Sequence, residues 1–372
     1  MASLVLENLI KRYGKVTALN DVSFEVKDGE FIVLLGPSGA GKTTTLKVIA
    51  GVEPITSGYI YIDGKLVNAL EPHEREVAMA YESYALYPHF TVYENLAFPL
   101  RNPKLHIPET EIDKQVKSIA ELLNIQMLLD RKPVELSNGQ KQRTSLGRCM
   151  VKKSKISLLD EPLSHLDAKL RHSMRTEFKR LQVDLNTTTI YVTHDYVEAL
   201  SLANRIIALD KGVIQQIGTP DELYNKPCNE FVAKILGEPE INLIDGSIKA
   251  HADQTYFISE DGSFQLDIKN ELKQIIQRGN FEKIRLGIRP LYMNLIQQKT
   301  TEPQPQVLDA KVYVFEPLGT KGVLTITIGG NKFNTLTNVN SKVEPNQNVK
   351  IAVNSDKIMF FDLNTKKNVL MA

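Results

Sequence analysis

Residues 36–44 read Gly36-Pro37-Ser38-Gly39-Ala40-Gly41-Lys42-Thr43-Thr44, and they directly follow the apolar run 31–35. A glycine-rich turn between an expected strand and an expected helix is the arrangement that grips a nucleotide phosphate chain with backbone N–H groups. The helix beginning near Lys42 would direct the positive end of its dipole at the phosphates. We expect Lys42 to reach the β- and γ-phosphates, the Thr43 hydroxyl to bind Mg²⁺, and the whole run 36–44 to contact the nucleotide. An ordinary glycine-rich turn is the weaker interpretation, because the run lies between a strand and a helix.

The size, charge and cysteine usage of the chain limit its possible functions. Its 372 residues exceed one ordinary domain, so we expect two domains or one large domain with an appendage. A formal net charge of +1 supports neither a nucleic-acid partner nor a basic membrane-binding face. Apolar runs fall far short of the roughly 20 residues that span a bilayer, and residues 1–15 lack a signal-peptide core, so any membrane role would come through a partner. Cys149 and Cys228 form no CxxC pair, which favours a reducing, cytoplasmic setting.

Residues 1–235 alternate short apolar runs with amphipathic segments, a pattern typical of a mostly parallel sheet covered by helices. Four apolar runs are expected to be buried strands: 31–35, 156–159, 189–192 and 206–209. Apolar residues at helical spacing mark the core-facing side of two helices, namely Ile112, Val116, Ile119 and Leu123 in one and Leu170, Met174, Phe178, Leu181 and Leu185 in the other. The run Thr219-Pro220-Asp221-Glu222 predicts a short helix that ends the first domain.

From about Gly237 onward, helical periodicity largely disappears and short alternating runs separated by Gly, Pro, Asn and Asp take over. We therefore expect an all-β domain over residues 236–372. Its candidate strands are 255–259, 283–287, 310–316, 323–328, 349–353 and 357–361. A small barrel of the oligonucleotide/oligosaccharide-binding type fits this length.

A second motif is the apolar run 156–159, which ends in Asp160-Glu161-Pro162. An enzyme with a phosphate-binding loop needs one acid near Mg²⁺ and a group that orients the attacking water, and we assign Asp160 and Glu161 to these two roles. Parallel sheets place ligand sites at the ends of their strands, so this pair should face the same crevice as Lys42. Alone, the motif would favour a purely structural interpretation; the upstream loop reverses that preference.

A third segment, Leu136-Ser137-Asn138-Gly139-Gln140, precedes an amphipathic helix that starts with Lys141-Gln142-Arg143. Ser137 with Gln140 three residues later forms a capping box, and outside this context that interpretation would be preferred. Capping does not explain the order of motifs, which runs from the phosphate-binding loop through 136–140 and Asp160-Glu161 to 163–167 and Thr193-His194-Asp195.

Over essentially its whole length, the sequence resembles the nucleotide-binding subunit of ATP-binding cassette (ABC) transporters. The resemblance implies a P-loop ABC ATPase domain at 1–235, with a helical subdomain at about 88–152, followed by the β-rich domain at 236–372, which would be an OB- or TOBE-like regulatory domain. ATP and Mg²⁺ would be the cofactors.

The resemblance also implies that the active sites are shared between two copies. Ser137 and Gly139, together with Gln140, match the signature that binds the γ-phosphate across a head-to-tail homodimer. Asp167 matches the loop that links the two sites. Neither site would then be complete in one subunit.

Three further roles follow from the resemblance. Tyr13 matches the aromatic residue that stacks on adenine, although a lone tyrosine is more often a turn or edge residue. His194 matches the histidine that contacts the γ-phosphate and the attacking water. With Lys42 and Glu161, it would form the catalytic group.

The segment 81–95 is similar to the loop that couples these ATPases to their membrane subunits. Glu82 stands where the family usually has glutamine. A carboxylate oxygen would still bind Mg²⁺, but the added charge near the phosphates would change affinity and coupling. Asn138, in place of the more frequent glycine, is a milder departure.

The β-rich tail narrows the class. Gly287-Ile288-Arg289-Pro290 and Glu316-Pro317-Leu318-Gly319 resemble recurrent elements in the regulatory domain of sugar-importer ATPases of the maltose and glycerol-phosphate type. Each run alone would be an ordinary turn sequence. Polyamine, sulfate and iron importers carry related tails, so carbohydrate is the favoured solute among several.

The resemblance thus implies an importer ATPase at the cytoplasmic face of the membrane. Its partners would be a second copy, two integral membrane permease subunits and, indirectly, an extracytoplasmic solute-binding protein. A soluble ABC ATPase acting on DNA or ribosomes is a weaker alternative, because such proteins usually need two cassettes or a long coiled coil and the sequence shows neither. A P-loop kinase would leave 136–140 and His194 unexplained, and the pair Asp160-Glu161 disfavours a non-enzymatic regulator.

Overall fold

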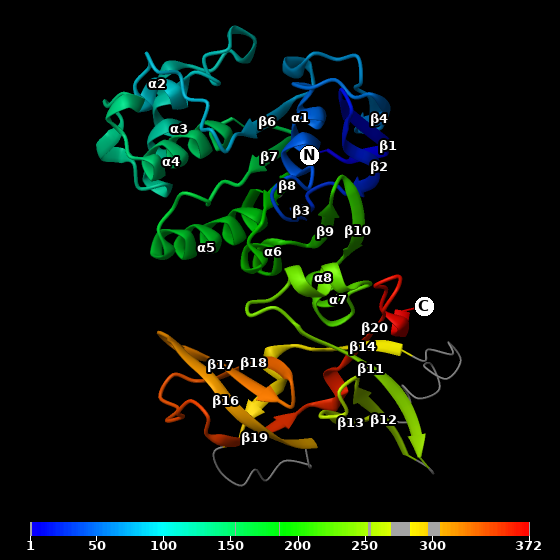
Figure 1. Cartoon of the computed structure of the whole chain (residues 1–372). Coiled ribbons are helices and arrows are strands. Elements are labelled where there is room, and N and C mark those ends of the chain that lie inside the picture. The colour runs from blue at the N-terminus through cyan, green and yellow to red at the C-terminus, as the bar shows by residue number, and fades with distance from the viewer. Residues whose placement is uncertain are drawn as a thin grey trace. The chain divides into compact units, whose positions relative to one another are not determined.

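The computed structural model describes residues 2–152, 154–185, 187–251, 254–268, 283–296 and 306–371. They form two compact units, Met1–Pro220 and Asp221–Ala372 (Figure 1). Residues 221–225 of one short helix and the whole helix 230–235 are part of the second unit. The domain boundary that we predict after residue 235 stays a prediction. Within the described residues, we find no helix with the length and apolar character needed to cross a membrane.

A six-stranded sheet forms the centre of the first unit, in the order β10-β9-β3-β8-β7-β6. Its strands are β3 (Phe31–Leu35), β6 (Val77–Ala80), β7 (Ile156–Asp160), β8 (Thr188–Thr193), β9 (Arg205–Asp210) and β10 (Val213–Gly218). All pairs are parallel except β9 with β10. The four strands predicted from apolar runs are therefore confirmed as β3, β7, β8 and β9.

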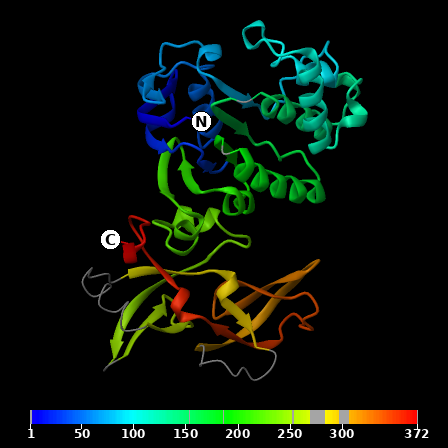
Figure 2. The same ribbon diagram turned by 180° about the vertical axis from the view of Figure 1, so that it is seen from behind.

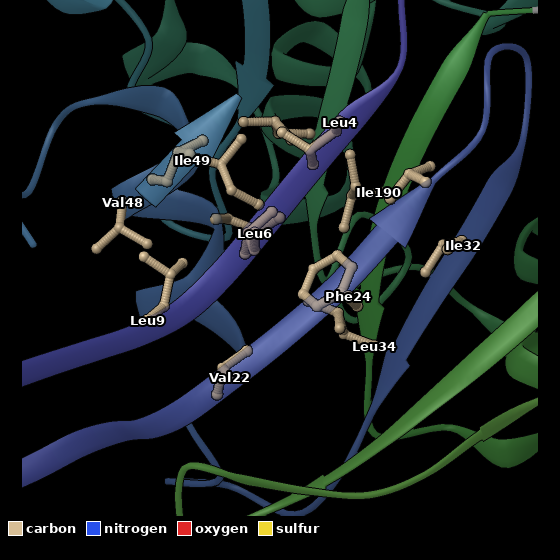
Figure 3. Packing of buried hydrophobic residues seen from close by; sticks show 14 of the residues in the cluster. Leu4, Leu6, Leu9, Val22, Phe24, Ile32, Leu34, Val48, Ile49 and Ile190 are labelled. Atoms are coloured by element: carbon tan, nitrogen blue, oxygen red, sulfur yellow. The ribbon is translucent and has the colours of Figure 1, made fainter. Parts of the chain in front are cut away.

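A second, antiparallel sheet in the same unit, in the order β2-β1-β4-β5, has no counterpart in the sequence-based expectations. It consists of β1 (Leu4–Tyr13), β2 (Val16–Val26), β4 (Ser57–Ile62) and β5 (Lys65–Leu66). Its buried side chains join those of α1 (Lys42–Ala50) and of the parallel sheet in one core, as Figure 3 shows for Leu6, Phe24, Ile32, Ile49 and Ile190. The helix behind the glycine-rich turn is thus held by apolar packing.

Helices α5 (Ala168–Leu185) and α6 (Tyr196–Leu202) pack against each other, and α6 also packs on β3 and β8. Phe178 of α5 contacts the ring of Tyr191 in β8, with centroids 5.9 Å apart. Because Ile190 of β8 lies in the core on the other side, this strand is buried on both faces, as expected for a parallel sheet. Met174 and Phe178 of the predicted stripe are buried, whereas the side chains of Leu181 and Leu185 lie outside the described residues.

Three helices form a separate group, to one side of the unit in Figures 1 and 2: α2 (Val92–Ala97), α3 (Glu109–Leu122) and α4 (Asn138–Met150). Ile112, Val116 and Leu123 are buried, which confirms most of the predicted stripe on α3. Helix α4 contacts α2 and α3 and also reaches β6 and β7 of the parallel sheet. It therefore links the helical group to the strand that carries Asp160.

The second unit contains two antiparallel sheets of five strands each, in the orders β13-β12-β11-β14-β20 and β15-β19-β16-β17-β18, and both contribute to one apolar core. Two short helices, α7 (Pro220–Asn225) and α8 (Glu230–Ile235), precede the strands. The strands are β11 (Asn242–His251), β12 (Gln254–Ser259), β13 (Gln265–Ile268), β14 (Lys283–Ile288), β15 (Met293–Leu295), β16 (Gln306–Leu318), β17 (Lys321–Ile328), β18 (Asn331–Asn338), β19 (Asn348–Val353) and β20 (Met359–Asp362). The predicted mixed α/β domain followed by a β-rich domain is confirmed.

Arg289, from the predicted tail element 287–290, has a structural function. Arg289 is 2 % exposed, and its guanidinium donates hydrogen bonds to the carbonyls of Tyr224, Ala233 and Leu236. It also lies 3.9 Å from the centroid of the Tyr224 ring. A buried charge is tolerated only where such partners replace water, so this residue fastens α7 and α8 to the strand that precedes it.

Candidate nucleotide site

One group of the predicted site residues follows four neighbouring strands of the parallel sheet. The glycine-rich loop follows β3, Glu82 follows β6, Glu161 follows β7 and His194 follows β8. Because these strands are parallel, their carboxyl ends meet at one edge, which is where such sheets bind ligands. The topology thus brings together residues that lie far apart in the sequence.

The loop 36–41 requires glycine for two different reasons. A Cβ atom on Gly36 would lie 2.2 Å from the carbonyl oxygen of Leu209, so the neighbouring strand leaves no space for a side chain. Gly41 has a φ of +104°, which L-residues rarely adopt, and a Cβ there would lie 2.7 Å from the carbonyl oxygen of Ala18. Glycine at these two positions thus lets the loop pack closely against both carbonyl groups where α1 begins.

Lys42 points back into this loop. Its Nζ donates hydrogen bonds to the carbonyl oxygens of Gly36 (2.9 Å) and Pro37 (3.0 Å) and lies 3.6 Å from Oε1 of Glu161. The residue is 5 % exposed. A buried ammonium group at the mouth of a glycine loop is suited to compensating phosphate charge.

Thr43 and Asp160 form the next contact. The Thr43 hydroxyl donates to Oδ1 of Asp160 over 3.0 Å, and Asp160 is 2 % exposed. Burial raises the pKa of Asp160 to about 6; the carboxylates of Glu82 and Glu161 add to the rise, while Thr43 and Lys42 oppose it. A divalent cation would stabilise this carboxylate in its charged form.

The donor set therefore fits Mg²⁺. A hydroxyl and a carboxylate are hard oxygen ligands, and Mg²⁺ usually takes one or two such protein ligands and completes its shell with phosphate oxygens and water. Among the described residues, we find no group of three or more His, Cys, Asp or Glu side chains arranged to hold a metal.

Glu161 and His194 form the third contact. Nδ1 of His194 lies 2.9 Å from Oε2 of Glu161. Glu161 has a φ of +44°, uncommon for a residue with a side chain, and its backbone N–H donates to the carbonyl of Val192 over 3.0 Å. The carboxylate is thus shared between His194 and Lys42, while the backbone is held in a strained turn.

Residues 137, 139 and 140 lie elsewhere, at the start of α4. The Ser137 N–H donates to Oε1 of Gln140 over 2.9 Å, and the Gln140 N–H donates to Oγ of Ser137 over 3.4 Å, which forms the capping box anticipated from the spacing. These side chains take no part in the contacts described above for Lys42, Asp160 and Glu161. A single chain therefore presents two separate groups of predicted site residues.

Tyr13, at the end of β1, is 43 % exposed. The Nζ of Lys11 lies 4.5 Å from its ring centroid and donates a hydrogen bond to Glu53 over 3.0 Å. One face of the ring is thus backed by a buried, paired ammonium group, and an aromatic ring held in this way offers a stacking surface for a nucleotide base.

The segment after β6 carries Glu82 and a group of aromatic side chains. Glu82 is exposed, and its charge contributes to the raised pKa of Asp160. Tyr87, 37 % exposed, packs its ring against that of Phe98, 46 % exposed, with centroids 4.9 Å apart. The segment therefore joins the sheet edge near Asp160 to an exposed aromatic surface on the helical group.

Two buried polar residues near the site escaped the sequence-based predictions. Glu198 accepts hydrogen bonds from the hydroxyls of Tyr191 and Thr193, each over 2.8 Å, and burial raises its pKa. Gln142, 4 % exposed, joins α4 to the turn at Glu161. Each lies on a helix after a cap, where the local sequence pattern does not distinguish a buried polar side chain from an exposed one.

Comparison with known proteins assigns the family. An ABC transporter family model matches residues 19–164. The chain is 44 % identical to the trehalose/maltose import ATP-binding protein of Thermococcus litoralis, over 99 % of this chain and 100 % of that protein. The chain belongs to the ABC transporter ATP-binding family. This confirms the predicted family and its P-loop ATPase fold.

Other ABC relatives agree with this membership. The chain is 40 % identical to the multiple sugar-binding transport ATP-binding protein of Streptococcus mutans, over 98 % of this chain and 99 % of that protein. It is 47 % identical to an sn-glycerol-3-phosphate import ATP-binding protein of Brucella abortus, over 75 % of this chain and 80 % of that protein.

Among solved structures, the chain is similar to a dimeric ABC cassette in a post-hydrolysis state bound to ADP and phosphate. The two share 28 % identity at a TM-score of 0.55, over 58 % of this chain and 98 % of that one. The ABC ATPase fold is thus confirmed, whereas the roles of individual site residues stay predictions.

Proposed function

We propose that this chain is the ATP-hydrolysing subunit of an ABC importer that carries a carbohydrate. The observation that supports hydrolysis is the Glu161 carboxylate, held between His194 (2.9 Å) and Lys42 (3.6 Å) at the sheet edge that also carries Thr43 and Asp160. The names of its relatives, which import trehalose and maltose, multiple sugars and glycerol phosphate, support carbohydrate as the solute class.

In the proposed reaction, ATP lies along the glycine-rich loop with its γ-phosphate toward Glu161. Lys42 leaves the carbonyls of Gly36 and Pro37 for the β- and γ-phosphates, and Tyr13 stacks on the base. Glu161 orients the attacking water or accepts its proton, and His194 contacts the γ-phosphate. Mg²⁺, held by Thr43 and Asp160, would neutralise charge on the phosphate oxygens.

The active site would be completed by a second copy. Ser137, Gly139 and Gln140 form a group separate from Lys42, and the similar ABC cassette is a dimer. We infer that two chains face head to tail, each offering its α4 N-terminus to the other's γ-phosphate, with Asp167 in the loop between the sites. The dimer would act on two membrane permease subunits at the cytoplasmic face of the membrane. An extracytoplasmic solute-binding protein would be an indirect partner, and the β-rich tail would regulate the ATPase.

The solute class is tested by uptake in the native host. In cells that lack this chain, uptake of radiolabelled maltose, trehalose or glycerol phosphate should fall to background; resupplying the parent chain should restore it, and the Lys42→Ala variant should not. Loss of spermidine, sulfate or iron uptake instead would change the solute class. Unchanged uptake of every solute would contradict an import function.

Glu82→Gln should separate binding from coupling. We expect the extra charge near Asp160 to strengthen a Mg²⁺ contact and repel the γ-phosphate to similar extents, so the substitution should change the MgATP dissociation constant by less than about tenfold, or 1.4 kcal/mol. The segment after Glu82 carries the exposed aromatic surface, and it is the segment expected to couple the ATPase to the membrane subunits. Glutamine, the usual residue of the family at this position, should therefore increase the stimulation of ATPase activity by those subunits.

The measurement compares MgATP affinity and stimulated turnover in the assembled transporter. Glu121→Gln, which removes an exposed carboxylate on α3, is the matched control and should change neither quantity. A large affinity change, or unchanged stimulation, would show that position 82 has no coupling role.

A further inference from the structure

The buried amide of Gln142 contacts both sides of the turn that carries Glu161. Its Nε2 donates hydrogen bonds to the backbone carbonyl of Glu161 (3.0 Å) and to Oγ of Ser164 (3.2 Å). Its Oε1 accepts a hydrogen bond from the backbone N–H of His165 over 3.1 Å. One side chain of α4 thus satisfies polar groups at both ends of the turn 161–165.

These contacts act on a strained residue. Glu161 has a φ of +44°, a conformation that a residue with a side chain keeps only where neighbouring groups hold it. Its carbonyl oxygen also accepts hydrogen bonds from the hydroxyl of Ser164 (2.9 Å) and from the Ser164 N–H (3.2 Å). Of these donors to the Glu161 carbonyl, Gln142 is the one that lies outside the turn, so its hydrogen bond fixes the turn relative to α4.

The direction of the Glu161 carboxylate depends on this turn. Its two oxygens point to His194, just after β8, and to Lys42 on α1, while its backbone is attached to α4 through Gln142. A rotation of the strained turn would move the carboxylate away from both partners, and displacements of about 1 Å can cost a hundredfold in rate.

We propose that Gln142 is a positioning residue for Glu161, which holds the carboxylate in its reactive direction without touching ATP. The inference rests on the proposed ATPase function. Because Ser137 is the N-cap of α4, the same amide connects the helix predicted to face the partner's nucleotide with the carboxylate of its own site.

The test uses the full chain with Gln142→Met, which keeps the length of the side chain and removes its hydrogen bonds. We expect kcat to fall about tenfold to a hundredfold, while KM for ATP changes less than about threefold. Ser145→Ala is the matched control: Ser145 is also buried on α4, and its hydroxyl has no hydrogen-bond partner among the described residues, so kcat should not change.

A double-mutant comparison separates positioning from general loss of structure. If Gln142 acts through Glu161, adding Gln142→Met to Glu161→Gln should lower the residual single-turnover rate by less than about twofold. A merely structural role would lower that rate by the same factor as in the parent chain, which would overturn the proposal. ATP-driven dimer formation in the double variant should also persist.

If Gln142→Met lowers the thermal midpoint markedly, Gln142→Leu takes its place, since it removes the same hydrogen bonds without burying a charge. The same selective loss of kcat is expected, because a leucine side chain neither donates to the Glu161 carbonyl nor accepts from the His165 N–H. Full activity in either folded variant would overturn the positioning role alone. An inactive parent chain would instead overturn the proposed ATPase function, so the two failures are distinguishable.

Discussion

Glu161→Gln is expected to lower ATP turnover by about a hundredfold or more while leaving MgATP affinity nearly intact. The amide matches the carboxylate in shape but neither accepts a proton from water nor pairs with Lys42, whose Nζ lies 3.6 Å from Oε1 of Glu161. The phosphate contacts expected from the glycine-rich loop and from Lys42 remain. Binding and chemistry should therefore separate in this variant.

Light scattering with and without ATP provides the second measurement for Glu161→Gln. ATP should trap the variant as a dimer, because the nucleotide that joins the two copies is no longer hydrolysed. Glu121→Gln on α3 serves as the control and should hydrolyse ATP at the parental rate. A Glu161→Gln variant that stays monomeric with ATP, or that turns over like the parent, would contradict the assigned role.

Mixing Lys42→Ala chains with Ser137→Arg chains should restore activity that neither has alone. In a mixed dimer, the first chain supplies an intact Ser137 and the second an intact Lys42, so one complete site forms. If the two sites are independent, each mixed dimer should reach up to roughly half of the parental activity, and strong coupling would lower that value. The separation of the Ser137 group from the Lys42 group within one chain is the structural basis of this expectation.

The experiment titrates ATPase activity against the mixing ratio of the two variants, with mixed dimers trapped. Each variant alone is the control and should be nearly inactive. Ser137→Arg alone should also lose ATP-driven association. If that variant associates with ATP as well as the parent does, Ser137 makes no contact across the dimer.

Local sequence patterns determined much of this protein. The glycine-rich run after β3, the apolar runs of β7, β8 and β9, and the capping box at Ser137 depend on residues close together in the chain, so spacing and side-chain type were enough to find them. The change from helical to alternating periodicity near Gly237 predicted the β-rich second unit for the same reason. The antiparallel sheet of β1, β2 and β4 was missed, since irregular pairing between residues 6 and 12 interrupts the alternation expected of a strand.

The tertiary structure alone decided how the site residues meet. His194 lies 33 residues from Glu161 in the chain, and their 2.9 Å contact depends on β7 and β8 being neighbours in the sheet. Gln142 was indistinguishable from other polar residues of an amphipathic helix until the packing of α4 against β7 placed its amide at the Glu161 turn. Residue type and spacing encode local conformation, whereas contacts between distant elements depend on how their buried surfaces fit together.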